Sequence, residues 1–243
     1  LKKDLEEMYS MIEVIVQENS GMGAANNVGI GLCKTDYAFV INPDVKFYNN
    51  TLNEMINFSS NSDDYCILAP ISDDVRFPNY KIKNKEIANN DNDYLSVDSV
   101  DGFAMLINKN KFKDNIYFDE NFFLYLENDD LCLRKKNENN LIYVLKKAKI
   151  NHLGGKSHSI IYEREIEYSR NWHWMWSKFY FNLKYYGYLI AFLRTLPSMI
   201  SSIIKILFYF LTINRYKKKI YLMRFLGLYN SMMGKSSWYR PKI

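Results

Sequence analysis

The strongest indication of the fold is the stretch Tyr37-Ala38-Phe39-Val40-Ile41-Asn42-Pro43-Asp44. Its first five residues form a continuous apolar run, which is typical of a strand buried on both faces of a sheet. The run stops at the proline, because proline cannot continue a central strand. Ligands of open α/β sheets bind beyond the carboxyl ends of the strands, and a carboxylate there can hold a divalent cation. Asp44 is therefore a candidate metal ligand, although a simple turn capped by Asp44 explains the same residues.

Short apolar strands alternate with helical segments on both sides of this stretch. Strands are predicted at 12–16, 37–41, 66–70, 100–107 and 141–145, and helices at 24–33, 51–59 and 126–137. The segment 73–96 is rich in Asn, Lys and Asp and is expected to form a loop with edge strands. This alternation predicts an α/β fold with a mostly parallel sheet.

A segment of small residues, Asn19-Ser-Gly21-Met-Gly23-Ala-Ala-Asn-Asn27-Val-Gly29, precedes the first stretch. Small residues allow a helix N-terminus and its backbone to approach a ligand closely. The spacing is neither the dinucleotide GxGxxG pattern nor a P-loop. Taken alone, the segment is explained at least as well by tight packing of a helix on the sheet.

Three carboxylates, Glu127, Asp129 and Asp130, crowd the start of a predicted helix after an aromatic segment. Acids in a first turn are stabilised by the helix dipole, which is the simpler explanation. Crowded carboxylates beside aromatic rings also shift pKa values apart, as general base catalysis requires. The density of the pattern favours a catalytic role. Further on, His152 precedes Gly154-Gly155-Lys156-Ser157, a loop that suits a phosphate, although a single histidine is more often structural.

Taken in order, these motifs resemble those of the inverting family 2 glycosyltransferases of the GT-A fold. The closest resemblance is to the rhamnosyltransferase-like branch that builds bacterial polysaccharides. The matching motifs are the segment 19–29, the Asn42-Pro43-Asp44 turn, the strand around Gly102, the segment 118–134 and His152 with the Gly and Ser residues after it. The resemblance covers about residues 12–185.

The resemblance implies a role for each motif. The residues that would bind the nucleotide-diphosphate sugar donor are Asn19, Gly21, Asn27, Asn42 and Gly102. Asp44 and His152 would hold Mg²⁺ or Mn²⁺. A carboxylate of the cluster Glu127, Asp129 and Asp130 would deprotonate the acceptor hydroxyl, which attacks the anomeric carbon with inversion.

One residue departs from the family pattern. Asn128 stands where the family has the aspartate that serves as base, and an amide cannot accept the proton. Glu127 or Asp129 would take that role, with Glu127 favoured, and Asp130 would position the others.

The resemblance also has consequences for the whole chain. The acceptor would be a growing, lipid-linked cell-surface polysaccharide. Residues 1–160 would form a GT-A domain that lacks its first two strands and exposes a sheet edge, so we expect a fragment or a second chain that supplies the rest.

Two other hypotheses remain open. The chain could be a catalytically silent remnant that acts as a membrane-surface scaffold, or an α/β enzyme that handles nucleotides or phosphosugars. The absence of a Gly-rich phosphate loop with its lysine argues against the second.

Charge divides the 243 residues into two parts. Residues 1–160 carry a net charge of −6 and residues 161–243 a net charge of +11, and no acidic residue follows Glu167. Hydrophobic residues make up 48%, which excludes a largely disordered chain. Three widely separated cysteines support neither a zinc ribbon nor a disulfide scaffold, so a cytoplasmic location is expected.

Residues 161–243 are predicted to form a basic, aromatic, helical tail. Within it, 195–213 contains a single charge, Lys205, and the basic cluster 215–219 follows. The tail could lie in a membrane interface, cross the bilayer or pack as buried helices on the catalytic domain. Either membrane hypothesis places the basic cluster against anionic lipid, so that the protein is peripheral to or anchored at the inner face of the cell membrane. Nucleic acid is not expected as a partner, because the tail is too apolar for a stacking groove.

Overall fold

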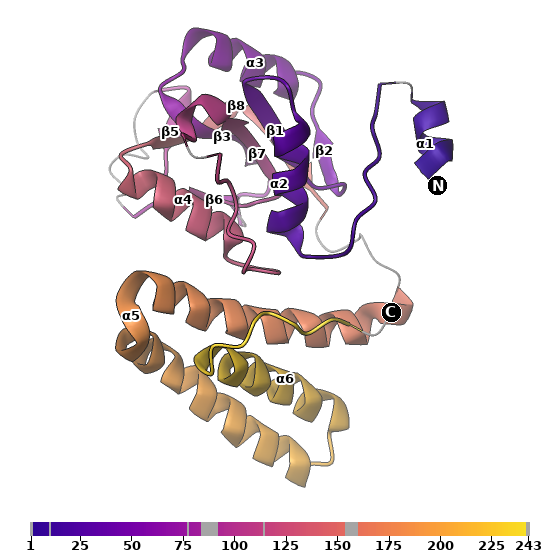
Figure 1. Cartoon of the computed structure of the whole chain (residues 1–243), viewed down its shortest axis with the longest axis vertical. Coiled ribbons are helices and arrows are strands. Elements are labelled where there is room, and N and C mark those ends of the chain that lie inside the picture. Colours follow the sequence, from indigo (N-terminus) through magenta and orange to yellow (C-terminus); the bar gives the residue numbers. More distant parts are fainter. Residues whose placement is uncertain are drawn as a thin grey trace.

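The computed structural model describes residues 2–9, 11–76, 78–83, 92–113, 115–153 and 160–241. An α/β layer lies above a group of helices formed by the last third of the chain (Figure 1). The first helix, α1 (Lys2–Met8), lies apart from the rest and contains no buried residue.

The main sheet has the strand order β1-β7-β3-β8-β2. Its strands are β1 (Tyr37–Ile41), β2 (Val45–Phe47), β3 (Tyr65–Ser72), β7 (Ala104–Asn108) and β8 (Leu141–His152), and β5 (Tyr94–Ser96) also pairs with β8. A separate pair is formed by β4 (Tyr80–Lys81) and β6 (Ser99–Val100). The centre of the sheet is the most deeply buried part of the core, because residues 65–69 of β3 have no exposed surface.

The expectation of a mostly parallel sheet is wrong. Within the described residues, β3 pairs in parallel with β8, whereas every other pairing in the sheet is antiparallel. The reason is the position of β7, which runs in the opposite direction between β1 and β3. β1 and β3 run in the same direction and are connected through α3 (Thr51–Asn61), but β7 lies between them, so they are not neighbours. A second helix, α4 (Glu127–Asn137), leads into β8, which pairs in parallel with β3.

The predicted strand at 12–16 does not form. These residues have no ladder partner in the described part of the chain, and the side chains of Ile12, Ile15 and Val16 are exposed. Their alternation fits a pleated surface, but a strand also requires a neighbour to bond with. On the next strand of the chain, β1 pairs with β7 along one edge and has no partner along the other within the described residues.

The remaining local predictions are close to the structure. The helices expected at 24–33, 51–59 and 126–137 appear as α2 (Met22–Leu32), α3 (Thr51–Asn61) and α4. The interruption expected at Gly102 separates β6 from β7. Short 3₁₀ turns occur at Lys109–Lys111 and Ile160–Tyr162. Residues 84–91 of the predicted loop and 154–157 of the predicted Gly-Lys loop lie outside the described residues.

The last third of the chain forms two long helices, α5 (Glu163–Leu211) and α6 (Arg215–Met232). Gly187 interrupts α5 with φ 77°, a conformation that glycine adopts without strain, and the helix turns sharply there (Figure 1). The first half of α5 contacts the α/β layer, and the second half packs with α6 below it. The aromatic residues Tyr168, Trp172 and Trp176 of the first half pack against Met223 of α6.

Candidate active site

A cavity of about 670 Å³ lies between the sheet and the first half of α5. It gathers most of the candidate residues named from the sequence, from five separate segments of the chain. These are Asn19, Gly21, Asn42, Asp44, Gly102, Glu127, Asp129 and His152. Asn27 and Asp130 lie outside it. A larger cavity of about 870 Å³ behind the segment 115–120 contains none of the candidate metal ligands or bases, so we place the candidate active site in the smaller one.

Asp44 and His152 lie at one side of this cavity. The antiparallel pairing of β2 with β8 places His152 opposite Val45, directly after Asp44. The Nε2 atom of His152 is 3.5 Å from Oδ1 of Asp44. The ring of Phe103 stacks on the imidazole with centroids 4.0 Å apart, which holds the histidine in this orientation. Pairing of strands that the sequence places 108 positions apart thus brings the two residues together.

The donor set of this pair fits a divalent cation that also binds a substrate. The described residues contain no group of three or more His, Cys, Asp or Glu side chains that could hold a metal ion by themselves. Mg²⁺, however, is usually bound by one or two protein ligands together with substrate phosphates and water. A carboxylate and an imidazole at the edge of an open cavity match that pattern.

Glu127 is the first residue of α4 and lies deep in the cavity wall. Tyr125 and Leu126 before it have φ of 72° and 68°, so a left-handed turn leads the chain into the helix. The side chain is 3% exposed, and its Oε2 atom has no hydrogen-bond partner in the described part of the chain. Burial, together with a smaller effect of the nearby charge of Asp129, raises the pKa of Glu127 to about 7. A carboxylate with this pKa can exchange a proton near neutral pH.

The three residues after Glu127 have different partners. Asn128 donates a hydrogen bond from Nδ2 to the carbonyl of Val100 at 2.8 Å, so its amide joins α4 to β6. Asp129 lines the cavity and forms an ion pair with Lys81 at 2.7 Å. Neither residue leaves an unpaired acceptor comparable to Oε2 of Glu127.

Asp130 is fully buried behind the cavity and joins the two parts of the molecule. Its carboxylate forms ion pairs with Arg134 at 3.2 Å and with Lys184 of α5 at 2.7 Å. It also accepts a hydrogen bond from the hydroxyl of Tyr185 at 2.8 Å. These contacts support the positioning role that was expected for Asp130.

The glycine-containing segment reaches the cavity through Gly21. This residue has φ 105°, and a Cβ atom on it would lie 2.4 Å from the carbonyl oxygen of Phe123. Only glycine therefore allows the N-terminus of α2 to approach the segment before α4 so closely. Asn27, one turn further along α2, hydrogen-bonds both backbone groups of Phe118 and so fastens α2 to that segment.

Several cavity residues were not singled out from the sequence. Asp101 directly precedes Gly102, and burial raises the pKa of its carboxyl group. Arg170 and Trp174 are four residues apart on α5 and line the cavity from the side of the predicted tail. Arg170 forms no hydrogen bond or ion pair with the described residues, and Trp174 is 41% exposed. The four-residue spacing of Arg170 and Trp174 indicates that they share one helix face. It does not indicate that this face lines the cavity.

Comparison with known proteins agrees with this geometry. Residues 1–116 match the family model described as Glycosyl transferase family 2, and a search of the curated proteins found no match. The matched region includes Gly21, Asn42, Asp44 and Gly102, whereas Glu127 and His152 lie beyond it. The match makes residues 1–116 similar to the family 2 glycosyl transferases, a family that uses nucleotide-sugar donors and has the GT-A α/β fold. Enzymes of this family commonly use a divalent metal.

Proposed function

We propose that the chain is a metal-dependent, inverting glycosyltransferase that moves a sugar from a nucleotide-diphosphate donor to an acceptor hydroxyl. The observation that supports this most directly is the single cavity that contains the Asp44–His152 pair, at 3.5 Å, and the buried, unpaired carboxylate of Glu127. Inverting transfer requires an anion-binding group for the leaving diphosphate and a base for the acceptor. Both kinds of group line this cavity.

The donor would bind at the Asp44 side of the cavity. Asp44 and His152 would hold Mg²⁺ or Mn²⁺ there, and a bound divalent cation neutralises the charge that develops on a leaving diphosphate. Gly21 and Gly102 line this cavity and allow Phe123 and Met22 to pack closely against its wall, and Asn19 and Asn42 offer polar side chains to the donor. Asn27 would contribute indirectly, because its bonds to Phe118 hold the helix that carries Gly21.

Glu127 would act as the general base. Its carboxylate accepts the proton of the acceptor hydroxyl as that oxygen forms a bond to the anomeric carbon. The bond from this carbon to the diphosphate oxygen breaks on the opposite face, so the configuration inverts. Asp129 is the second candidate, but both of its carboxylate oxygens already accept hydrogen bonds from Lys81 at 2.7 Å.

The identity of the substrates follows from the resemblance of the motifs rather than from the cavity. We propose rhamnose or another hexose as the transferred sugar and a growing, lipid-linked cell-surface polysaccharide as the acceptor. The reaction would take place at the cytoplasmic face of the cell membrane. Contact with a membrane is supported by α5, which is the one described helix with the length and apolar composition that suit a bilayer.

The test is binding of nucleoside diphosphates in the presence and absence of Mn²⁺. We expect heat of binding from at least one of UDP, GDP and dTDP that depends on Mn²⁺, and its loss in Asp44→Ala. The matched control is Asp63→Ala, because Asp63 is exposed just before β3 and lies outside the cavity. An Asp44→Ala variant that binds as tightly as the wild type would contradict the metal assignment. No Mn²⁺-dependent binding by the wild type would favour the silent scaffold.

A further inference from the structure

The second half of α5, residues 188–211, carries an unbroken apolar stripe on its outer face. Most of its members are three, four or seven residues apart, which places them on one side of the helix, and Leu196 and Pro197 line the same groove between Leu193 and Ile200. Its members are 40–77% exposed: Leu189, Leu193, Ile200, Ile203, Ile204, Leu207, Phe208 and Leu211. From the first to the last, the stripe is about 33 Å long. Soluble monomers rarely expose continuous apolar surface of this extent.

The opposite face of the same helix is packed inside the molecule. Ala191, Thr195 and Ser202 are at most 2% exposed. Two hydrogen bonds join this helix to the first half of α5, from Lys178 to Ser198 at 2.9 Å and from Arg194 to Asn182 at 3.1 Å. Since the helix is apolar on both faces and already packed on one, the stripe is left to contact something outside the described chain.

The charges around the stripe indicate which kind of surface it contacts. No acidic residue follows Glu167 in the sequence, so neither the second half of α5 nor α6 carries an acidic side chain of its own. Lys205 lines the same shallow groove as Leu193, Ile200 and Ile204. Beyond the end of the stripe, Lys218 lies 5.5 Å from the ring of exposed Phe210. Apolar side chains with cations at their margins are complementary to the acyl region and anionic headgroups of a lipid monolayer.

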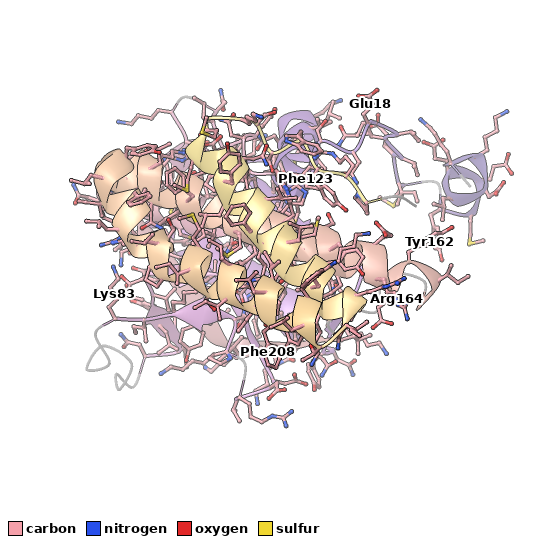
Figure 2. The ribbon with its side chains drawn as sticks, turned by 90° about the horizontal axis from the view of Figure 1, so that it is seen from below. Glu18, Lys83, Phe123, Tyr162, Arg164 and Phe208 are labelled. Atoms are coloured by element: carbon pink, nitrogen blue, oxygen red, sulfur yellow. The ribbon has the colours of Figure 1, made fainter. Side chains whose placement is uncertain are left out.

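We infer that the 188–211 stripe lies in the plane of an anionic bilayer surface, with its apolar side chains inserted and the lysines at headgroup level. This inference rests on the membrane location proposed above and specifies which surface makes the contact. Viewed from below in Figure 2, the second half of α5 and α6 lie in front of the α/β layer, with Phe208 near the end of the α5 segment. The bilayer would therefore lie on the side of the helices that faces away from the sheet.

The neighbouring helices exclude the other two arrangements of this segment. In the most apolar window of 18 residues, with mean hydropathy 1.5, only 17% is buried, so the segment is not a core helix. If it crossed the bilayer, α6 beside it would enter the hydrocarbon with its basic residues: Arg215, Lys217, Lys218, Lys219 and Arg224. Charged side chains are too costly at that depth. An in-plane position leaves these residues at the surface.

The first test is co-sedimentation of the full chain with vesicles of phosphatidylglycerol and phosphatidylcholine. We expect Ile200→Asp/Ile204→Asp to weaken vesicle binding by about tenfold or more, because two inserted side chains are replaced by charges. The matched control is Leu52→Asp/Ile56→Asp, which has the same spacing and similar exposure on α3, at the far side of the molecule. Equal loss of binding in both double variants, or in neither, would overturn the inference.

The second test separates charge from apolar insertion. Lys217→Gln/Lys218→Gln should weaken binding to phosphatidylglycerol-containing vesicles by about fivefold for each lysine and leave binding to pure phosphatidylcholine unchanged. The Mn²⁺-dependent binding of nucleoside diphosphates should be unaffected in all of these variants. Loss of vesicle binding with intact nucleotide binding in these variants therefore supports the membrane inference. Intact vesicle binding without Mn²⁺-dependent nucleotide binding would contradict the proposed function and leave the membrane inference standing.

The third test determines the orientation. A fluorophore is attached at one position at a time through Leu193→Cys, Ile200→Cys, Ile204→Cys or Leu211→Cys, each in a Cys33→Ser background. All four fluorophores should be quenched by shallow lipid quenchers and should lie at the same depth in the bilayer. Depths that pass from one surface through the bilayer centre would show a crossing helix. If the chain is instead a dimer without lipid, and Ile200→Asp/Ile204→Asp makes it monomeric, a second copy covers the stripe and the inference is wrong.

Discussion

Glu127 combines two properties that a structural residue avoids. It is 3% exposed, and one of its oxygens has no hydrogen-bond partner among the described residues. Burial without a hydrogen-bond partner disfavours the charged form of the carboxylate, so the pKa of Glu127 is raised to about 7. A base works best when its pKa is close to the pH of the reaction, so the same burial that destabilises Glu127 suits it to accept a proton.

We expect Glu127→Gln to reduce kcat by about 10²–10⁴, because the amide has nearly the same shape but cannot accept the proton. In the wild type, the rate should fall as the pH drops below about 7, where Glu127 becomes protonated. Initial rates measured across pH check both expectations. The comparison variant is Asp129→Asn, and a larger loss in that variant would transfer the role of base to Asp129.

Glu127→Gln should also stabilise the protein at alkaline pH. The carboxyl group has an ordinary pKa of 4.5 and a native value of about 7, so in this window the native state binds a proton that the unfolded chain has released. Stability therefore falls as pH rises from 4.5 to 7, by about 3 kcal/mol in all. Urea unfolding should show the variant more stable than the wild type at pH 8, with little difference at pH 4. Exposed Glu7→Gln provides the control, and a variant that is less stable at pH 8 would contradict the buried position.

At the scale of elements, the contact between α5 and α6 depends on one glycine. A Cβ atom at Gly227 would lie 2.1 Å from the backbone oxygen of Trp172, so the two helices meet backbone against backbone at this point. This close approach allows the aromatic cluster of Tyr168, Trp172 and Trp176 to pack on Met223. The helices of the tail thus have a core separate from that of the sheet.

Gly227→Ala should destabilise the protein by about 1–3 kcal/mol, because the helices must move apart to admit the methyl group. Gly31→Ala provides a contrast on α2, since nothing lies within 4 Å of the added Cβ. That change should stabilise the helix by about 0.5–1 kcal/mol through the lower entropy of the unfolded chain. Thermal unfolding of both variants measures the two changes in stability. Equal changes would show that the contact at Gly227 does not determine helix packing.

At the scale of the whole molecule, the cavity belongs to both parts of the chain. Asp44 and His152 come from the side of the sheet, whereas Arg170 and Trp174 come from α5. Buried contacts fix the two parts together, among them the hydrogen bond from Ser177 to the carbonyl of Leu124 at 2.9 Å and the ion pair of Lys184 with Asp130. The helix that would lie on a membrane therefore continues directly into the wall of the candidate active site.

Trp174→Ala should lower kcat/KM by about tenfold through loss of stacking on a sugar ring, while the melting temperature stays close to that of the wild type. Trp174 is exposed to the cavity, so little core packing is lost. Trp238→Ala removes another exposed tryptophan outside the cavity and serves as the control. Unchanged kinetics in Trp174→Ala would show that the α5 wall does not contact substrate.

The local features of this protein follow from short-range patterns in its sequence. The apolar run 37–41 forms a strand, and the segments 51–59 and 126–137 form helices close to their observed bounds. The expectation that the run is buried on both faces is wrong: β1 lies at the edge of the described sheet, and only Ala38 and Val40 are buried. Asn42, Asp44, Glu127 and Asp129 line the same cavity, whereas Asp130 lies behind it. These residues could be named from the sequence because turn chemistry and crowded carboxylates are properties of neighbouring residues. The charge asymmetry and the apolar segment after residue 195 likewise required no structure to detect.

Long-range pairing determined the rest. The direction of β7, the absence of a strand at 12–16 and the meeting of Asp44 with His152 each depend on which strands become neighbours, and that choice is not encoded within any single strand. The raised pKa of Glu127 and the contribution of Arg170 and Trp174 depend on what packs over the cavity. Periodicity in the sequence identifies the apolar face of a helix or strand. Only the tertiary structure determines which residues that face contacts, because burial and electrostatic environment arise from contacts between residues far apart in sequence.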